Sequence, residues 1–144
     1  MGAAAIVYAH VNALSFVQDQ LEVDRMTRIV VAGWVDVPAD KRQEALEGAK
    51  PFIIAGREEA GCIAYNWTPD PYQPERIHIF EEWSGQDELA EHLRSEPYKN
   101  MLQHLSGVGI AGSSTQKYRV DHFEPVYDET GVPRADFFTA AGSS

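Results

Sequence analysis

The sequence predicts one α+β domain of the ferredoxin-like kind, an antiparallel sheet with helices on one face. The main observation is the order of the patterns along the chain, which reads strand, helix, strand, strand, helix, strand. The second is a first strand that is apolar on both sides, and the third is a proline-rich loop between the second and third strands. With 144 residues, 44% of them hydrophobic and 10% aromatic, the chain can fill one compact core.

The first strand is predicted over Ile29–Val35, where nearly every residue is apolar. A strand with one face in water would alternate with polar residues, so we expect both faces of this strand to be buried. Asp40, followed three residues later by Gln43, is typical of a capped helix start. The helix that follows has one apolar face, formed by Ala45, Leu46, Ala49, Phe52 and Ile53.

A strand hairpin comes next. Its strands are predicted over Cys62–Thr68 and Arg76–Trp83, and the loop Pro69–Pro74 between them carries too many prolines to continue a ladder. A helix follows, with Ser84 and Asp87 as its expected cap, and its inward stripe consists of Leu89, His92 and Leu93.

Pro97 suits the first turn of a third helix. One face of that helix is formed by Tyr98, Met101, Leu102 and Leu105. The last strand is predicted over Thr115–Phe123.

Residues 27–124 thus form the predicted domain, preceded by an extension over residues 1–26 and followed by a turn-rich tail over residues 125–144. The sequence leaves open whether the extension is an added helix, an upstream start or another kind of segment. Helices cover only one face of such a sheet, although the first strand is apolar on both sides. We therefore expect a homodimer in which the second sheet face packs against its own copy.

The net charge of −10, from 22 acidic and 12 basic residues, argues against nucleic acid or an anionic membrane surface as the main partner. No apolar run reaches the roughly 20 residues that a membrane helix needs. The single cysteine, Cys62, excludes an intrachain disulfide and fits a cytoplasmic location.

Four residues stand out as candidates for chemistry. His92 lies on the inward stripe of a helix, where it either lines a pocket or hydrogen-bonds a carbonyl in the core. Trp83, at a strand end, either donates to a ligand or fills the core. Asn66 interrupts a strand as a pocket residue or an edge residue, and Tyr72 forms a pocket rim or a solvated turn.

Other chemistries find no support in the residue spacing. The five histidines form no pair at the spacing i, i+4, so we expect no metal site. Gly107, Gly109 and Gly112 lack the spacing of a dinucleotide-binding loop, and no nucleophile elbow is present. We therefore expect no bound cofactor.

Three segments, Gly61–Tyr65, Ile77–Trp83 and His92–Tyr98, resemble the antibiotic biosynthesis monooxygenase family of small dimeric α+β barrels. The resemblance covers about residues 27 to 123. Members of this family oxidise quinols or polycyclic phenols with dioxygen and without a prosthetic group, and a related branch degrades haem. That branch has an asparagine on its first strand, which this chain lacks, so the resemblance disfavours haem degradation.

The resemblance implies a cofactor-independent monooxygenase whose partners are a small aromatic substrate and dioxygen. His92 would act as base or hydrogen-bond partner, with Asn66 and Trp83 as orienting donors. The implied substrate-binding residues are Tyr72, Tyr98, Phe52 and Glu81. The alternative is a dimeric barrel that binds a small molecule without turnover.

Overall fold

The computed structural model describes residues 27–139, so the predicted extension over residues 1–26 lies outside the described part of the chain. The described elements are β1 (Arg28–Asp36), a 3-10 turn η1 (Ala39–Lys41), α2 (Arg42–Arg57), β2 (Cys62–Pro69), β3 (Arg76–Trp83), α3 (Gln86–Arg94), α4 (Glu96–Val108) and β4 (Gly112–Val120).

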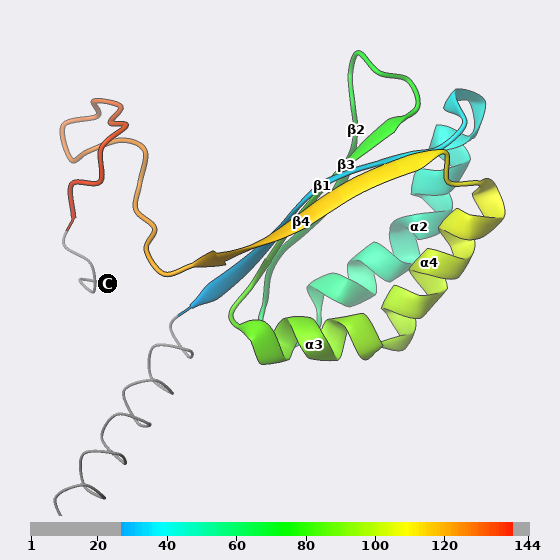
Figure 1. Cartoon of the computed structure of the whole chain (residues 1–144), viewed down its shortest axis with the longest axis horizontal. Helices are drawn as coiled ribbons and strands as arrows, with labels where there is room; N and C mark the ends of the chain where they lie inside the picture. The colour runs from blue at the N-terminus through cyan, green and yellow to red at the C-terminus, as the bar shows by residue number, and fades with distance from the viewer. Residues whose placement is uncertain (1–26, 140–144) are drawn as a thin grey trace, which may run out of the picture.

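The four strands form one antiparallel sheet in the order β2-β3-β1-β4. The three α-helices lie on the same face of this sheet (Figure 1). This order and layering confirm the predicted ferredoxin-like fold.

The core lies between the sheet and the helices and has two parts. The larger part joins the strand residues Val35, Ile77 and Ile79 to small residues of α2 and to Met101 and Leu105 of α4. The second part joins Ile29, Tyr65, Trp83 and Leu89 at the other end of the sheet. Side chains alternate along a strand, which explains why Ile77, Ile79, Glu81 and Trp83 of β3 all face the helices.

Two predicted helix caps are wrong. Neither Asp40 nor Ser84 supplies a capping side chain, because α2 begins through a 3-10 turn and α3 begins after Gly85. Gln43 instead donates to Glu47 one turn later, at 2.6 Å. The side-chain cap that does form belongs to Ser95, whose hydroxyl accepts from the backbone N–H of Tyr98 at 3.3 Å, and Pro97 lies in the first turn of α4 as predicted.

The last strand ends three residues earlier than predicted, because it pairs with the nine residues of β1 from Arg28↔Val120 to Asp36↔Gly112. Phe123 lies beyond the strand, with the Arg28 guanidinium 3.8 Å from its ring centre. Leu93 was expected to be buried, but it is 46% exposed because the helices leave the sheet edge at β4 partly uncovered.

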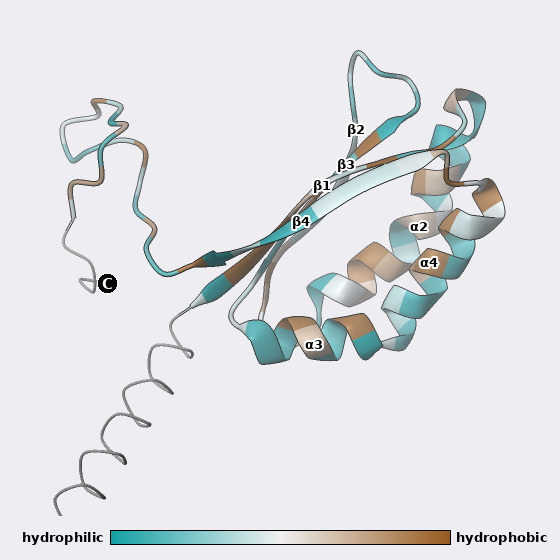
Figure 2. Ribbon diagram, viewed as in Figure 1, coloured by the Kyte–Doolittle hydropathy of each residue, from teal (hydrophilic) through white to brown (hydrophobic). Residues whose placement is uncertain are grey.

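The sheet face opposite the helices carries apolar side chains. Val30, Ala32 and Trp34 of β1 point to this side, and their register partners on the neighbouring strands include Phe80 and Tyr118, which are exposed. Figure 2 shows that apolar residues concentrate on the inner strands and helices, whereas β4 is neutral or hydrophilic along most of its length.

The segment after β4 leads away from the sheet and consists of turns (Figure 1). Its backbone closes on itself through a bridge between Tyr127 and Pro133. The Glu124 carboxylate accepts hydrogen bonds from the backbone N–H groups of Phe138 and Thr139, both at 2.8 Å. The turn-rich character predicted for this tail therefore holds over its described residues.

Candidate functional site

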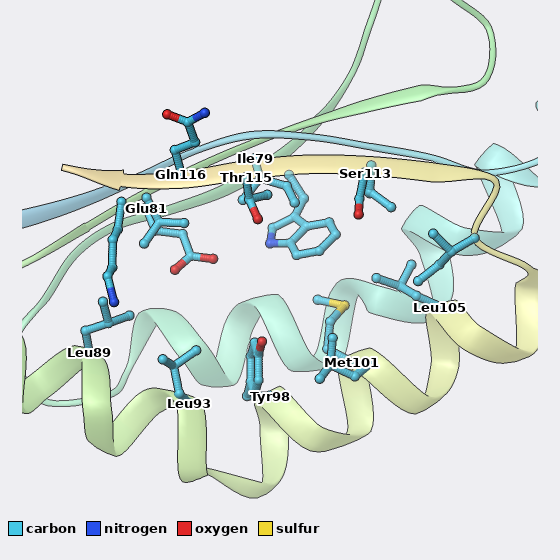
Figure 3. A pocket seen from close by; sticks show the side chains of 16 residues that line it. Ile79, Glu81, Leu89, Leu93, Tyr98, Met101, Leu105, Ser113, Thr115 and Gln116 are labelled. Atoms are coloured by element: carbon cyan, nitrogen blue, oxygen red, sulfur yellow. The ribbon is translucent and has the colours of Figure 1, made fainter.

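A cavity of about 420 Å³ lies between the sheet and the two helices α3 and α4. Figure 3 shows Glu81 pointing from the sheet toward the helices and Tyr98 pointing back toward the sheet. The residues that line the cavity are Val31, Val35, Trp67, Ile79, Glu81, Leu89, Leu93, Tyr98, Met101, Leu102, Leu105, Ile110, Ser113, Thr115, Gln116 and Lys117. The walls are mostly apolar, with a few polar groups, as is typical of a small-molecule site.

Glu81 is the ionisable group of the cavity wall that is best shielded from water. Its position on β3 turns the carboxylate toward the helices, and the residue is only 5% exposed. The indole N–H of Trp83 donates to Glu81 Oε2 at 3.1 Å. Burial raises the pKa of this carboxyl, although the Trp83 hydrogen bond and nearby His92 oppose that shift. A carboxylate with a raised pKa binds a proton more readily than an ordinary glutamate does.

Two tyrosines stand near this carboxylate. Burial, followed by the negative field of Glu81, raises the pKa of the Tyr98 hydroxyl, which lies in the cavity wall. The same two causes raise the pKa of Tyr65, a fully buried residue of β2. Both phenols therefore keep their protons at neutral pH and can act as hydrogen-bond donors.

His92 lies behind the cavity wall, in an aromatic cluster. Its ring centre is 4.5 Å from that of Trp83, with an angle of 32° between the planes, and 5.1 Å and 5.2 Å from the rings of Tyr65 and Tyr98. The residue is 1% exposed and does not belong to the cavity lining.

Glu59 connects this cluster to two helices. His92 Nδ1 donates to Glu59 Oε2 at 2.8 Å, and the Ser95 hydroxyl donates to Glu59 Oε1 at 3.0 Å. The second ring nitrogen of His92 is buried and has no hydrogen-bond partner among the described residues. The Glu59 carboxylate thus fixes the orientation of the imidazole that packs against Trp83.

The structure brings four of the seven predicted site residues together, namely His92, Trp83, Glu81 and Tyr98. The other three lie elsewhere. Asn66 accepts a hydrogen bond from Arg57 at 2.9 Å, Tyr72 is 91% exposed in the loop between β2 and β3, and Phe52 packs against the larger part of the core. None of these three lines the cavity, and the roles predicted for all seven residues stay predictions.

Sequence reasoning missed the contribution of β4 to the cavity. Ser113, Thr115 and Lys117 alternate along this strand and face the helices, whereas Gln116 points the other way in Figure 3. The available signal was the inward side of this strand, where Ser113, Thr115 and Lys117 are all polar, since an inward side without apolar residues indicates that no helix packs tightly there.

Among residues 27–139, no three His, Cys, Asp or Glu side chains gather in a way that could bind a metal ion. Within the same range, no helix combines the length and the apolar character needed to cross a bilayer.

Comparison with known proteins identifies the family. The sequence profile described as antibiotic biosynthesis monooxygenase matches residues 28–103, which is more than half of the chain and includes Glu81, Trp83 and His92. The chain belongs to the antibiotic biosynthesis monooxygenase family. The resemblance predicted from three sequence segments is therefore confirmed.

Individual proteins are also similar to this chain. The chain is 36% identical over 70 residues to the uncharacterized protein sll1783 of Synechocystis sp., a match that covers 49% of this chain and 47% of that relative. A conserved protein from Methanosarcina mazei is 29% identical, with a TM-score of 0.61 over 67% of this chain and 96% of that one.

A protein of unknown function from Bacteroides thetaiotaomicron, described as a possible oxidoreductase, is 23% identical. It has a TM-score of 0.59 over 65% of this chain and 98% of that one. This likeness shows the fold alone.

We predict that replacing Glu81 with glutamine stabilises the protein at neutral pH. The folded state raises the pKa of Glu81, so it holds that proton more tightly than the unfolded state does, and stability must fall as pH rises through the folded pKa. Glutamine keeps the acceptor for Trp83 but carries no charge. Thermal melting should show a higher melting temperature for Glu81→Gln at pH 7, with the gain shrinking toward pH 4. Glu58→Gln, at an exposed carboxylate, is the control and should change little.

We also predict that His92→Gln destabilises the fold by about 1 kcal/mol or more, because the buried imidazole packs on three rings and binds Glu59. Chemical denaturation measures this loss. His104→Gln is a matched control, since His104 also bonds across elements, to the Ala45 carbonyl at 3.0 Å, but lies outside the aromatic cluster around His92 and should lose less stability. Unchanged stability of His92→Gln would contradict the assigned packing role.

Proposed function

We propose that this protein is a cofactor-independent monooxygenase that oxidises a quinol or polycyclic phenol with dioxygen. In this reaction a quinol and dioxygen give a hydroxyquinone and water. The observation that carries the proposal is the buried Glu81 carboxylate in the wall of an apolar cavity, in a chain of the antibiotic biosynthesis monooxygenase family.

Glu81 is assigned the first step, the removal of the phenolic proton. The substrate O–H bond breaks, the proton moves to a Glu81 carboxylate oxygen, and the electron pair stays on the substrate oxygen. The cavity keeps the same net charge, because the negative charge moves from Glu81 to the substrate. The raised pKa of Glu81 makes this transfer more favourable than it would be for an exposed carboxylate.

The resulting phenolate is the electron donor for dioxygen. The apolar walls from Leu89, Met101 and Leu105 exclude water from the ring, which protects the reactive intermediate from side reactions. The Tyr98 hydroxyl is placed in the wall to donate a hydrogen bond to a substrate oxygen. Trp83 orients Glu81, and the Glu59–His92 pair holds Trp83 in place.

We further propose that the protein acts as a homodimer that buries the sheet face opposite the helices. Support comes from Val30, Ala32 and Trp34 of β1, with exposed Phe80 and Tyr118 beside them. Such a contiguous apolar area is typical of an interface between protein chains.

Oxygen uptake with a panel of quinols and naphthols tests the proposed reaction. We predict uptake by the purified protein without added cofactor, and a loss of about 10²-fold or more in Glu81→Gln, because general base help is removed. Glu58→Gln should keep normal uptake. The Glu81 variant is expected to be more stable than the natural protein at pH 7, so unfolding would not explain its loss. Normal uptake by Glu81→Gln would remove Glu81 from the mechanism, and binding without any uptake would favour a non-catalytic barrel.

Sedimentation of Phe80→Lys tests the dimer. Phe80 is 43% exposed on the open sheet face, and a lysine there would leave an unpaired charge in the interface, at a cost of several kcal/mol. We predict a dimer for the natural protein and a folded monomer for the variant at micromolar concentration. Ile54→Lys, at a 47% exposed position on α2, should remain dimeric. A dimeric Phe80→Lys protein would place the interface elsewhere.

A further inference from the structure

Lys117 and Glu81 face the same cavity from opposite sides of β1. In the sheet register Val31 pairs with Glu81 on one neighbouring strand and with Lys117 on the other, so the three residues form one row across the sheet. All three line the cavity. Neighbouring strands are about 4.8 Å apart, which separates the backbones at Lys117 and Glu81 by roughly 10 Å. The row therefore carries one basic and one acidic residue whose backbones are about as far apart as the two ends of an aromatic ring system.

The Lys117 ammonium is not used by the fold. Lys41 and Lys99 each pair with a glutamate three residues away, at 2.9 Å in both cases. Lys117 forms no such ion pair within residues 27–139, although the chain has 22 acidic residues. The nearest acidic group in its row, Glu81, is hydrogen-bonded to Trp83 instead.

On the helix side, Lys117 has mostly apolar neighbours together with the polar Gln86 of α3. Leu89 and Leu93 of α3 line the cavity together with Lys117, and the same three residues also line a second hollow that opens beside it. Lys117 thus stands at the end of the cavity that leads outside. An aromatic ring placed against these leucines would bring a charged substituent to the ammonium while its interior end approached Glu81.

We propose that Lys117 determines specificity by binding the carboxylate of the substrate, so that the substrate class is a hydroxylated aromatic carboxylate. This inference rests on the proposed function, because it names the substrate of the same cavity. The phenolic hydroxyl lies toward Glu81, and the carboxylate lies toward Lys117. A cavity of about 420 Å³ is within the range of pockets that hold small aromatic molecules.

The ion pair between Lys117 and the ligand carboxylate adds more to the preference for an anionic ligand than to the total affinity. The apolar walls bind the ring of a neutral and of an anionic ligand alike, whereas the ammonium favours only the anion. Lys117 is exposed, so we expect this attraction to lie at the upper end of the range for a surface ion pair. Added salt weakens it, because Lys117 remains accessible to solvent ions.

Anaerobic calorimetry at pH 7 with two matched ligands tests the proposal. The ligands are 6-hydroxy-2-naphthoate, which carries its hydroxyl and carboxylate at opposite ends of the ring system, and 2-naphthol, which lacks only the carboxylate. The natural protein should bind the naphthoate about fivefold more tightly, a difference of about 1 kcal/mol. Lys117→Met should lose this preference while binding 2-naphthol as before, and Lys117→Arg should retain it. Lys99→Met is the control on a helix surface and should behave as the natural protein does.

An unchanged preference in Lys117→Met would overturn the proposal, and so would equal or absent binding of the two ligands by the natural protein. Binding without oxygen separates this test from the proposed reaction. A Lys117-dependent preference without oxygen uptake would refute the monooxygenase and keep the ligand class. Oxygen uptake together with an unchanged preference in Lys117→Met would support the monooxygenase and refute the ligand class.

Discussion

The constraint on which the site depends is a carboxylate kept out of water. Glu81 faces the helices because the alternation of β3 puts it on the same side as Ile79 and Trp83. A buried carboxylate needs a hydrogen-bond donor, and the Trp83 indole supplies one to Glu81. The indole is held by the His92 ring, and His92 is oriented by Glu59. Glu59, just after α2, and His92, near the end of α3, therefore fix the position of Trp83 and, through it, that of Glu81.

The cavity exists because the helices do not pack tightly over the full width of the sheet. Helix α2 packs on β2 and on α4, and the larger part of the core fills that side. The opposite edge of the sheet is β4, whose inward side chains are Ser113, Thr115 and Lys117 instead of core residues. Apolar side chains of α3 and α4 face these polar groups across an open space (Figure 3). The arrangement gives a ligand an apolar side for its ring and a polar side for its oxygens.

Much of the fold could be predicted from the sequence, because its signals are local. The apolar run of β1 predicts a buried strand from its own residues, and the prolines before β3 predict a loop in the same way. The predicted limits of β3 were correct to the residue. The helix caps were not predictable from the spacing of Asp40 and Gln43, since a 3-10 turn replaced the expected start. The site was predictable in part. A strand-end Trp83 and an inward His92 are visible in the sequence, whereas the cavity wall formed by Lys117 depends on the pairing of β4 with β1.

Burial between the sheet and the helices raises the pKa of the Glu81 carboxyl. Carbon-13 NMR of the glutamate side-chain carboxyl groups follows each titration directly, and the Glu81 signal is assigned by its absence in Glu81→Gln. We predict a midpoint above the ordinary glutamate pKa of about 4.3. Loss of the Trp83 hydrogen bond, in Trp83→Phe, should move the midpoint higher still, because that bond favours the charged form. A midpoint at or below the ordinary value in the natural protein would show that burial does not raise the pKa of Glu81, and would contradict its role as the base.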